Sequence, residues 1–204
     1  MHEIGQITLL QVQRSSLKVG RHLHKYYDPS PLLIVDRLLI SAKGALGVTA
    51  DGSQVIDLHH VDHPASHNQS GVNGLSVGFT SHYAAMRSRF GQHMVDGCAG
   101  ENVLVAVERE LRLADLRNGL AIQTQDTGQV VYLTGLMVAA PCVEFSHFAA
   151  NYGMPLPDAE LQAALQFLHH GRRGFYATAT GDQVAVRAGD RVFLVSVEPS
   201  GSEA

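Results

Sequence analysis

The sequence predicts a mainly β protein whose short strands close into a barrel, with a few helices packed outside it. Two observations support this: many short apolar or alternating segments, and turn residues spaced evenly between them. A third is composition, since 45% hydrophobic and 17% charged residues in a chain of 204 supply one substantial core. No internal repeat or long linker divides the chain. We therefore expect a single domain over residues 1–204, with residues 196–204 as a frayed polar tail.

The first third of the chain is predicted to consist of strands joined by turns. Residues 7–13 partly alternate between apolar and polar side chains, as a half-buried strand does. Residues 26–31 hold an Asp-Pro and a Ser-Pro pair and predict a loop, whereas β-branched side chains favour a strand over residues 32–40. An Asp-Gly pair separates residues 45–49 from residues 54–58, which indicates a β-hairpin.

The rest of the chain combines helices with further strands. A helix is predicted over Thr80–Phe90, capped by its first residue and followed by Gly91. Asp158 is predicted to cap another helix, whose apolar side chains recur at helical spacing until Gly171. A short helical turn is expected over residues 111–118. The remaining predicted strands are residues 103–107, 121–125, Val130–Val138, Phe175–Thr180, Val184–Arg187 and 192–197.

Cys142 is the residue around which we expect a functional site. The strand Val130–Val138 leads towards it, and Pro141 ends the strand because proline cannot donate a backbone hydrogen bond. A short helix is expected to begin near Val143, which would place the thiol at a helix N-terminus, where the thiolate is favoured. Thiolates bind soft metals and carry sulfur. A lone cysteine is also often only a small buried apolar residue, so position alone leaves both interpretations open.

A histidine-rich stretch follows the predicted hairpin. It contains His59, His60, His63 and His67, with acidic residues among them. Their spacing matches no helical zinc motif, and the breakers in residues 63–74 predict a loop. A loop of solvated or capping histidines is the simpler interpretation.

Charge and composition exclude several classes of protein. A formal net charge of -4 argues against a nucleic-acid-binding surface. The longest apolar stretch, residues 32–40, is interrupted by Asp36 and Arg37 and is too short to span a membrane. The first residues lack the basic and apolar regions of a signal peptide. Because two cysteines fit a reducing compartment, we expect a cytoplasmic protein without nucleic-acid or membrane partners.

Four short motifs occur in a characteristic order. They are a Gly-Glu-Asn turn before a strand, a Pro-Cys pair, an Arg-Arg-Gly-aromatic turn and a Gly-Asp-x-Val strand, at residues 96–105, 141–142, 171–176 and 189–192. In this order they resemble the MOSC domain, named for the C-terminal part of molybdenum cofactor sulfurase. The resemblance covers roughly residues 50–195. It implies a β-barrel like the barrel domain of pyruvate kinase, with helices packed outside.

The resemblance also implies a cofactor. Proteins similar to this one bind molybdenum cofactor, and a cysteine such as Cys142 either ligates the molybdenum or holds a sulfur for transfer. The cofactor's dithiolene already holds the metal, so one further soft ligand is sufficient. Cys98 is the poorer candidate, because the family does not require cysteine in its turn. A pyridoxal phosphate domain, with which some relatives are paired, does not fit on this chain.

Five other residues have a role implied by the resemblance. Glu101 and Asn102 would hydrogen-bond the pterin, and Gly100 would form the turn that presents them. Gly100 and Asn102 could equally serve backbone geometry alone. Arg172 and Arg173 would clamp the cofactor's phosphate through their forked guanidinium groups. Either arginine could instead complement the carbonyl groups at the end of the preceding helix, and we expect only one to reach the site.

His63 and His67 complete the predicted site. In the family, the segment that matches residues 63–74 borders the substrate opening, and a helix with a His-Tyr pair follows it, here His82-Tyr83. We therefore expect His63 and His67 to lie near the site, with a catalytic role in substrate binding or proton transfer rather than as zinc ligands.

Three functions remain open from the sequence. The first is an oxidoreductase that uses molybdenum cofactor to reduce N-hydroxylated small molecules, with electrons from a partner protein. The second is a carrier that holds the cofactor, or a sulfur received from a desulfurase, on Cys142. The third is a barrel that lost the cofactor and binds another small molecule through the histidine-rich loop. A homodimer is compatible with all three.

Overall fold

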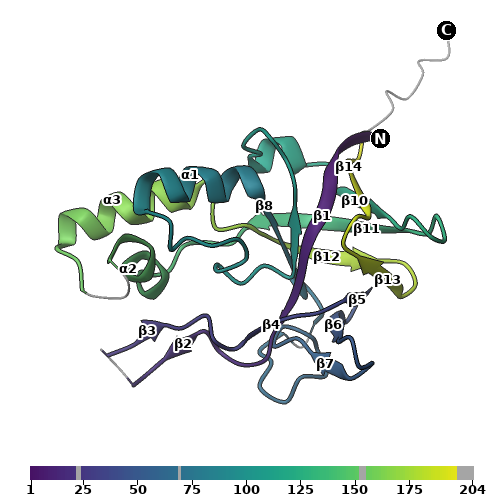
Figure 1. Cartoon of the computed structure of the whole chain (residues 1–204), viewed down its shortest axis with the longest axis horizontal. Helices are drawn as coiled ribbons and strands as arrows, with labels where there is room; N and C mark the ends of the chain where they lie inside the picture. Colours follow the sequence, from purple (N-terminus) through teal and green to yellow (C-terminus); the bar gives the residue numbers. More distant parts are fainter. Residues whose placement is uncertain (22–23, 69, 152–154, 197–204) are drawn as a thin grey trace, which may run out of the picture.

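The computed structural model describes residues 1–21, 24–68, 70–151 and 155–196. Residues 197–204 of the predicted polar tail therefore lie outside the described residues. The described chain is mainly β, which confirms the predicted fold class. Its centre is a closed barrel of seven strands in the order β14-β10-β11-β12-β8-β9-β1, closed by pairing of β14 with β1 (Figure 1). These strands are β1 (His2–Gln13), β8 (Leu75–Phe79), β9 (Val103–Val105), β10 (Leu120–Gln123), β11 (Val130–Val138), β12 (Phe175–Thr180) and β14 (Arg191–Leu194).

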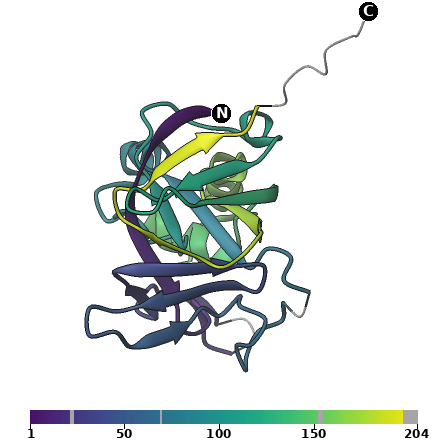
Figure 2. The same ribbon diagram turned by 90° about the vertical axis from the view of Figure 1, so that its right-hand side faces the viewer.

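A second sheet lies beside the barrel. Figure 2 shows it below the barrel strands, and its order is β13-β5-β6-β7. The predicted hairpin is confirmed, because β6 pairs antiparallel with β7. The long β1 continues out of the barrel, where its end pairs with the short strand β4. The chain between β1 and β4 forms a two-stranded ribbon, β2–β3. The strands are β2 (Lys18–Val19), β3 (Tyr26–Tyr27), β4 (Leu32–Ile34), β5 (Arg37–Ser41), β6 (Gly44–Val48), β7 (Gln54–Ile56) and β13 (Val184–Arg187).

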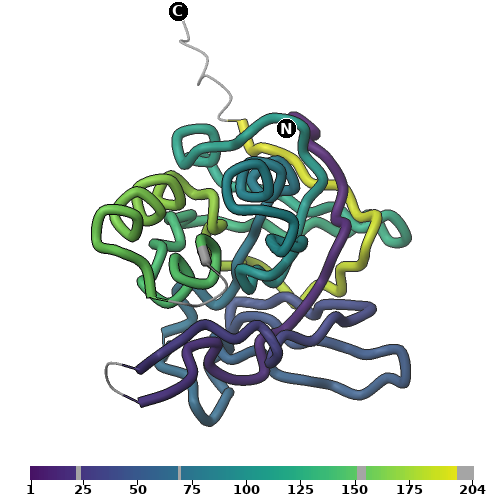
Figure 3. The backbone as a smooth tube through the Cα atoms, turned by 60° about the vertical axis from the view of Figure 1, so that its left-hand side comes forward, coloured from purple at the N-terminus to yellow at the C-terminus, as the bar shows by residue number. Residues whose placement is uncertain are grey.

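The helices gather on one side of the barrel, as Figures 1 and 3 show. They are α1 (Thr80–Phe90), α2 (Val143–Asn151) and α3 (Asp158–His169), with one turn of 3-10 helix, η1 (Leu113–Leu116). One hydrophobic cluster fills the barrel, and another lies between the helices and the β2–β3 ribbon. Tyr27 of the ribbon belongs to this second cluster together with Tyr83 of α1 and Phe145 of α2. None of the helices in the described residues is long and apolar enough to cross a membrane.

Both predicted helix caps are wrong, although the helices begin where expected. The hydroxyl group of Thr80 exchanges hydrogen bonds with the backbone of Val107, so it ties the start of α1 to the segment after β9. Pro157 stands at the cap position of α3, and Asp158 is the first helical residue. A carboxylate there still favours the helix, because it faces the positive end of the helix dipole.

Two predicted segments divide differently from expectation. The strand over residues 32–40 is broken at Val35 and Asp36, because the chain leaves β1 there and joins the second sheet. The loop predicted over residues 26–31 begins instead with the short strand β3. Also unpredicted is β8, a strand of five buried residues that runs parallel to β9.

Candidate functional site

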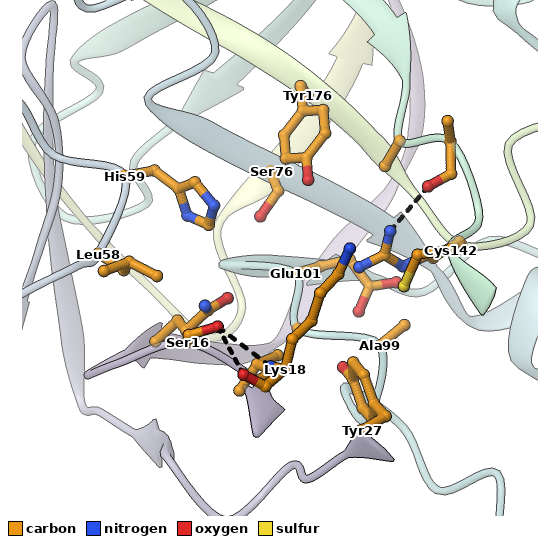
Figure 4. A pocket seen from close by; sticks show the side chains of 16 residues that line it. Ser16, Lys18, Tyr27, Leu58, His59, Ser76, Ala99, Glu101, Cys142 and Tyr176 are labelled. Carbon is orange, nitrogen blue, oxygen red and sulfur yellow. Dashed lines mark hydrogen bonds between the residues drawn. The ribbon is translucent and has the colours of Figure 1, made fainter. Parts of the chain in front are cut away.

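A cavity of about 350 Å³ lies where the barrel, the β2–β3 ribbon and the start of α2 meet. Four of the residues predicted for the site line it, namely Gly100, Glu101, Cys142 and Arg173. Figure 4 shows Cys142 and Glu101 on one side of this cavity, His59 on the other and Lys18 extending between them. Segments far apart in the sequence thus combine a thiol, a carboxyl group and two cations in one place.

The strand-to-helix position predicted for Cys142 is confirmed. Strand β11 ends at Val138, and α2 begins at Val143. The carbonyl oxygen of Cys142 accepts hydrogen bonds from both the backbone N–H and the hydroxyl group of Ser146, at 3.0 and 2.9 Å. The thiol sulfur lies 3.5 Å from the backbone nitrogen of Phe145, which donates to it. The half-buried thiol is thus held at the helix start and opens into the cavity.

Glu101 is buried at the wall of the cavity, with 2% of its surface exposed. Tyr83 donates a hydrogen bond of 2.6 Å to Oε2, whereas Oε1 has no partner among the described residues. Burial raises the pKa of Glu101 to about 7, although the bond from Tyr83 opposes the shift. Two glycines make room for the side chain, since a Cβ at Gly78 would lie 2.6 Å from Oε1 and one at Gly174 2.8 Å from Cγ. The carboxyl group can therefore exchange a proton near neutral pH.

The two adjacent arginines have different surroundings. Arg173 lines the cavity, donates 2.8 Å to the carbonyl oxygen of Ala140, and has a buried Nε without a partner among the described residues. Arg172 instead donates 2.7 Å to the carbonyl oxygen of Phe167 and lies 4.3 Å above its ring. It also forms an ion pair with Glu110 at 3.0 Å. Arg172 thus closes the end of α3, and Arg173 is the arginine available to a ligand.

Asn102 lies behind the cavity wall. Its Oδ1 accepts from the backbone N–H and the hydroxyl group of Ser76, both at 3.0 Å. Its Nδ2 donates to the carbonyl oxygen of Gln11 and to the carboxylate of Asp57. Asn102 therefore holds strands β1 and β8 together. Gly100 lines the cavity with a φ of +95°, a conformation that favours glycine.

Three residues of the cavity were missed from the sequence as members of the site. Lys18, on the ribbon, forms an ion pair of 3.5 Å with Glu144, so it reaches from the ribbon to the first turn of α2. His59 and Tyr176 line the opposite part of the cavity. The ring Nδ1 of His59 lies 3.0 Å from the fully buried Asp57, which also accepts from the backbone of His59. An Asp-x-His spacing was the available signal for His59, and Tyr176 ends the Arg-Arg-Gly-aromatic motif, whereas nothing near Lys18 in sequence indicates chemistry.

The two histidines predicted for the site occupy other places. His67 lines a neighbouring cavity. The Nδ1 of His63 accepts a hydrogen bond from the backbone of Ala65, within its own turn. Their catalytic role stays a prediction. In the part of the chain that the structure describes, no three His, Cys, Asp or Glu side chains are grouped closely enough to hold a metal ion.

Comparisons with known proteins agree with this fold. A family model described as the MOSC domain matches residues 73–193, more than half of the chain. The YuaD protein from Bacillus subtilis has a similar structure, with 15% identity, a TM-score of 0.57, and coverage of 92% of this chain and 93% of that one. A structure described only as a hypothetical protein matches at 14% identity and a TM-score of 0.51, over 97% of this chain and 71% of that one.

A third structure is YiiM from Escherichia coli, at 13% identity and a TM-score of 0.49, over 95% of this chain and 71% of that one. Likeness at such low identities shows the fold alone. A comparison with curated proteins gives no match. The family model, which spans the motifs around Glu101, Cys142 and Arg173, places the chain in a family associated with molybdenum cofactor. The chain belongs to the MOSC domain family.

Proposed function

We propose that the cavity binds molybdenum cofactor with Cys142 as the soft ligand, and that the protein reduces N-hydroxylated small molecules with electrons from a separate donor protein. The observation that carries the proposal is the convergence of Cys142, Arg173, Lys18 and Glu101 on one cavity. These side chains come from four segments of the chain, so their meeting is a property of the fold.

The residues of the cavity fit the cofactor. A thiol is the type of ligand that a soft metal takes in addition to a dithiolene. The cofactor's phosphate needs cations, and Arg173 with its unpartnered Nε and Lys18 supply them. Its pterin presents both donors and acceptors, and the buried Oε1 of Glu101, which has no partner among the described residues, can accept from the pterin when ionised or donate to it when protonated.

When bound, the cofactor supplies two-electron chemistry at the metal. The overall reaction R–NH–OH + 2 e⁻ + 2 H⁺ → R–NH₂ + H₂O consumes two protons, so the site must provide proton donors. Glu101 holds a proton near neutral pH because burial raises the pKa of its carboxyl group to about 7. Asp57 can only accept from Nδ1 of His59, which orients the ring and leaves Nε2 for proton exchange. His59 is therefore the histidine of this cavity that we propose for proton transfer, while a catalytic role of His63 and His67 stays a prediction.

A carrier function is the second candidate. Cys142 is half-buried and opens into the cavity, so a cofactor or a persulfide sulfur on the thiol could be passed to a partner. Both functions need the same cysteine. One assay distinguishes them, in which purified protein loaded with cofactor is supplied with a chemical reductant and an N-hydroxylated compound. A reductase turns the compound over, whereas a carrier does not.

Metal analysis tests the shared part of both functions. The protein is purified in parallel from a host that makes molybdenum cofactor and from one that cannot. We expect roughly stoichiometric molybdenum in the first preparation and none in the second. Equal molybdenum in the two preparations, or none in either, would contradict the proposal.

A further inference from the structure

Tyr83, on α1, is fully buried and contacts the carboxyl group of Glu101. Glu101 lines the proposed cofactor cavity (Figure 4), whereas Tyr83 does not. The hydroxyl group of Tyr83 makes two hydrogen bonds. It donates 2.6 Å to Oε2 of Glu101 and accepts 3.0 Å from the backbone N–H of Ala99. A residue outside the cavity thus holds one oxygen of a carboxyl group that lines it.

The bond from Ala99 fixes the direction of the hydroxyl hydrogen of Tyr83. A phenol has a single hydrogen to donate. The backbone N–H of Ala99 already points at the phenol oxygen, so the hydrogen of Tyr83 must point elsewhere. Among the described residues, Glu101 is the only acceptor for it. The hydrogen between the two side chains therefore belongs to Tyr83, and Oε2 of Glu101 is the accepting atom.

This direction decides which oxygen of Glu101 carries the proton when the carboxyl group is protonated. Such a group has one O–H and one oxygen that only accepts. A hydrogen on Oε2 would face the hydrogen of Tyr83 across 2.6 Å, or would leave that buried hydroxyl group without an acceptor. A hydrogen on Oε1 meets no such conflict, because Oε1 has no partner among the described residues. Since Oε2 is occupied, Oε1 is also the oxygen that remains for a ligand.

Tyr83 differs from the other titratable and charged groups around Glu101. Those that act on its carboxyl group are Tyr83 on α1, Arg173 before β12, Asp96 and Cys98 before β9, and Tyr27 on the β2–β3 ribbon. The cavity adds Lys18, His59, Cys142 and Tyr176. Of these side chains, only Tyr83 forms a hydrogen bond with the carboxyl group in the part of the chain that the structure describes.

We infer that Tyr83 is a positioning residue for Glu101: it confines the exchangeable proton of the carboxyl group to Oε1. Glu101 therefore presents a ligand with a donor or an acceptor at one defined atom, a donor when protonated and an acceptor when ionised. The use of this atom by the cofactor or the reaction rests on the proposed function. The position of the proton can be measured without the cofactor.

Tyr83→Phe tests the inference, because it removes the hydroxyl group and keeps the ring. The full chain is made with carbon-13 glutamate in a host without the cofactor, and the carboxyl signal of Glu101 is identified by its absence from Glu101→Gln. A hydrogen bond to an ionised group is about twice as strong as a neutral one, so its loss should raise the proton affinity of Glu101 about tenfold. The midpoint of the NMR titration should thus rise by about one pH unit. An unchanged or lower midpoint would overturn the inference.

Tyr27→Phe is the matched control. The hydroxyl group of Tyr27 is buried in the same hydrophobic cluster, but it donates 2.8 Å to the carbonyl oxygen of Cys98 instead of to Glu101. This variant should leave the titration midpoint of Glu101 unchanged. If it raises the midpoint as much as Tyr83→Phe does, the shift comes from the cluster as a whole and the inference fails.

A measurement on the unaltered protein covers the case in which Tyr83→Phe does not fold. The hydroxyl hydrogen of Tyr83 lies in a buried bond of 2.6 Å, so it should give a proton NMR signal far downfield. We expect this signal on both sides of the midpoint of Glu101, with a shift that follows the carboxyl titration, because Oε2 stays the acceptor while the charge changes. Loss of the signal on the acid side would place the proton on Oε2 and contradict the inference, as would a signal that ignores the titration.

Molybdenum content separates this inference from the proposed function. The expected effect of Tyr83→Phe in a protein that never acquires molybdenum would refute the proposed function only. A parent protein that binds molybdenum, combined with an unchanged midpoint in Tyr83→Phe, would refute only the inference.

Discussion

Arg172 and Arg173 are neighbours in sequence, and their surroundings predict opposite consequences of removal. Arg172 makes a charged hydrogen bond to the carbonyl oxygen of Phe167, a ring contact with the same residue and an ion pair with Glu110. A charged hydrogen bond contributes about 1.5–3 kcal/mol, and a half-exposed ion pair adds at most about 1 kcal/mol. Because such terms are not additive, we expect Arg172→Ala to cost roughly 2 kcal/mol, or about 4–8 °C in melting temperature.

Arg173→Ala should have the reverse profile. The side chain makes one hydrogen bond, to Ala140, and lies 5.3 Å above the ring of Phe145. Its removal also removes the free-energy cost of a cation whose Nε is buried and has no partner among the described residues, so the net loss in unfolding free energy should be about 1 kcal/mol. Loss of a partner for the cofactor's phosphate should instead cost about 2–3 kcal/mol of binding, roughly 30-fold to 150-fold in affinity.

The assay combines two measurements on each variant. Melting of the cofactor-free protein is followed by calorimetry, and molybdenum is measured after dialysis of protein from the cofactor-making host. Arg173→Lys should retain an intermediate amount, because lysine keeps the charge but loses the fork. The reasoning fails if Arg172→Ala loses molybdenum while melting normally, or if Arg173→Ala melts much lower and keeps its molybdenum.

Three further predictions concern the cofactor-free protein. Burial raises the pKa of Glu101 from 4.5 in the unfolded chain to about 7 in the folded protein, so the folded state binds the proton more tightly. The resulting contribution to the free energy of unfolding is complete below pH 4.5 and is lost as the pH rises through about 7. Glutamine does not titrate, so the free energy of unfolding of Glu101→Gln should rise by roughly 3 kcal/mol relative to that of the parent protein when the pH is raised from acid to mildly basic. Denaturant titrations at several pH values measure this difference, and a difference that stays constant with pH would contradict the raised pKa. Iodoacetamide should modify Cys142 alone under native conditions, because Cys98 is 4% exposed and burial raises the pKa of its thiol. Mass spectrometry of treated Cys142→Ser should therefore show no adduct, and an adduct on Cys98 would count against this expectation. Calorimetry should show a single unfolding transition, since barrel and helices share one chain without a linker; two separate transitions would indicate two domains.

The sequence predicted those elements whose patterns are long or have clear ends. The limits of β11, β12, β13 and α1 match expectation, because each strand is rich in β-branched or aromatic residues and a proline or glycine follows each element within a few residues. Strand β8 was missed although apolar residues alternate with serine and glycine in its sequence, because it is only five residues long and lies directly between a predicted loop and a predicted helix. The two-residue strands β2 and β3 have no pattern of their own, and the ribbon that they form is held to α2 by the packing of Tyr27 against Phe145.

The candidate site was predicted in part for a related reason. Cys142 and Glu101 stand in local motifs, and the structure brings both to one cavity. Lys18 and His59 belong to segments that reach the cavity only through the folded ribbon and second sheet, so their local sequence, including the Asp-x-His spacing at His59, could not place them in the site. The motif with Arg172 and Arg173 could not show which arginine faces the ligand, since that depends on where α3 ends against Phe167.

Molybdenum content of cysteine variants tests most directly the claim that Cys142 holds the cofactor. Cys142→Ser and Cys98→Ser are purified beside the parent protein from the cofactor-making host, and unfolding is measured to confirm that each is folded. Cys142→Ser should lose its molybdenum because a hydroxyl group is a poor soft ligand, whereas Cys98→Ser should keep it. Folded Cys142→Ser that retains as much molybdenum as the parent would contradict the claim.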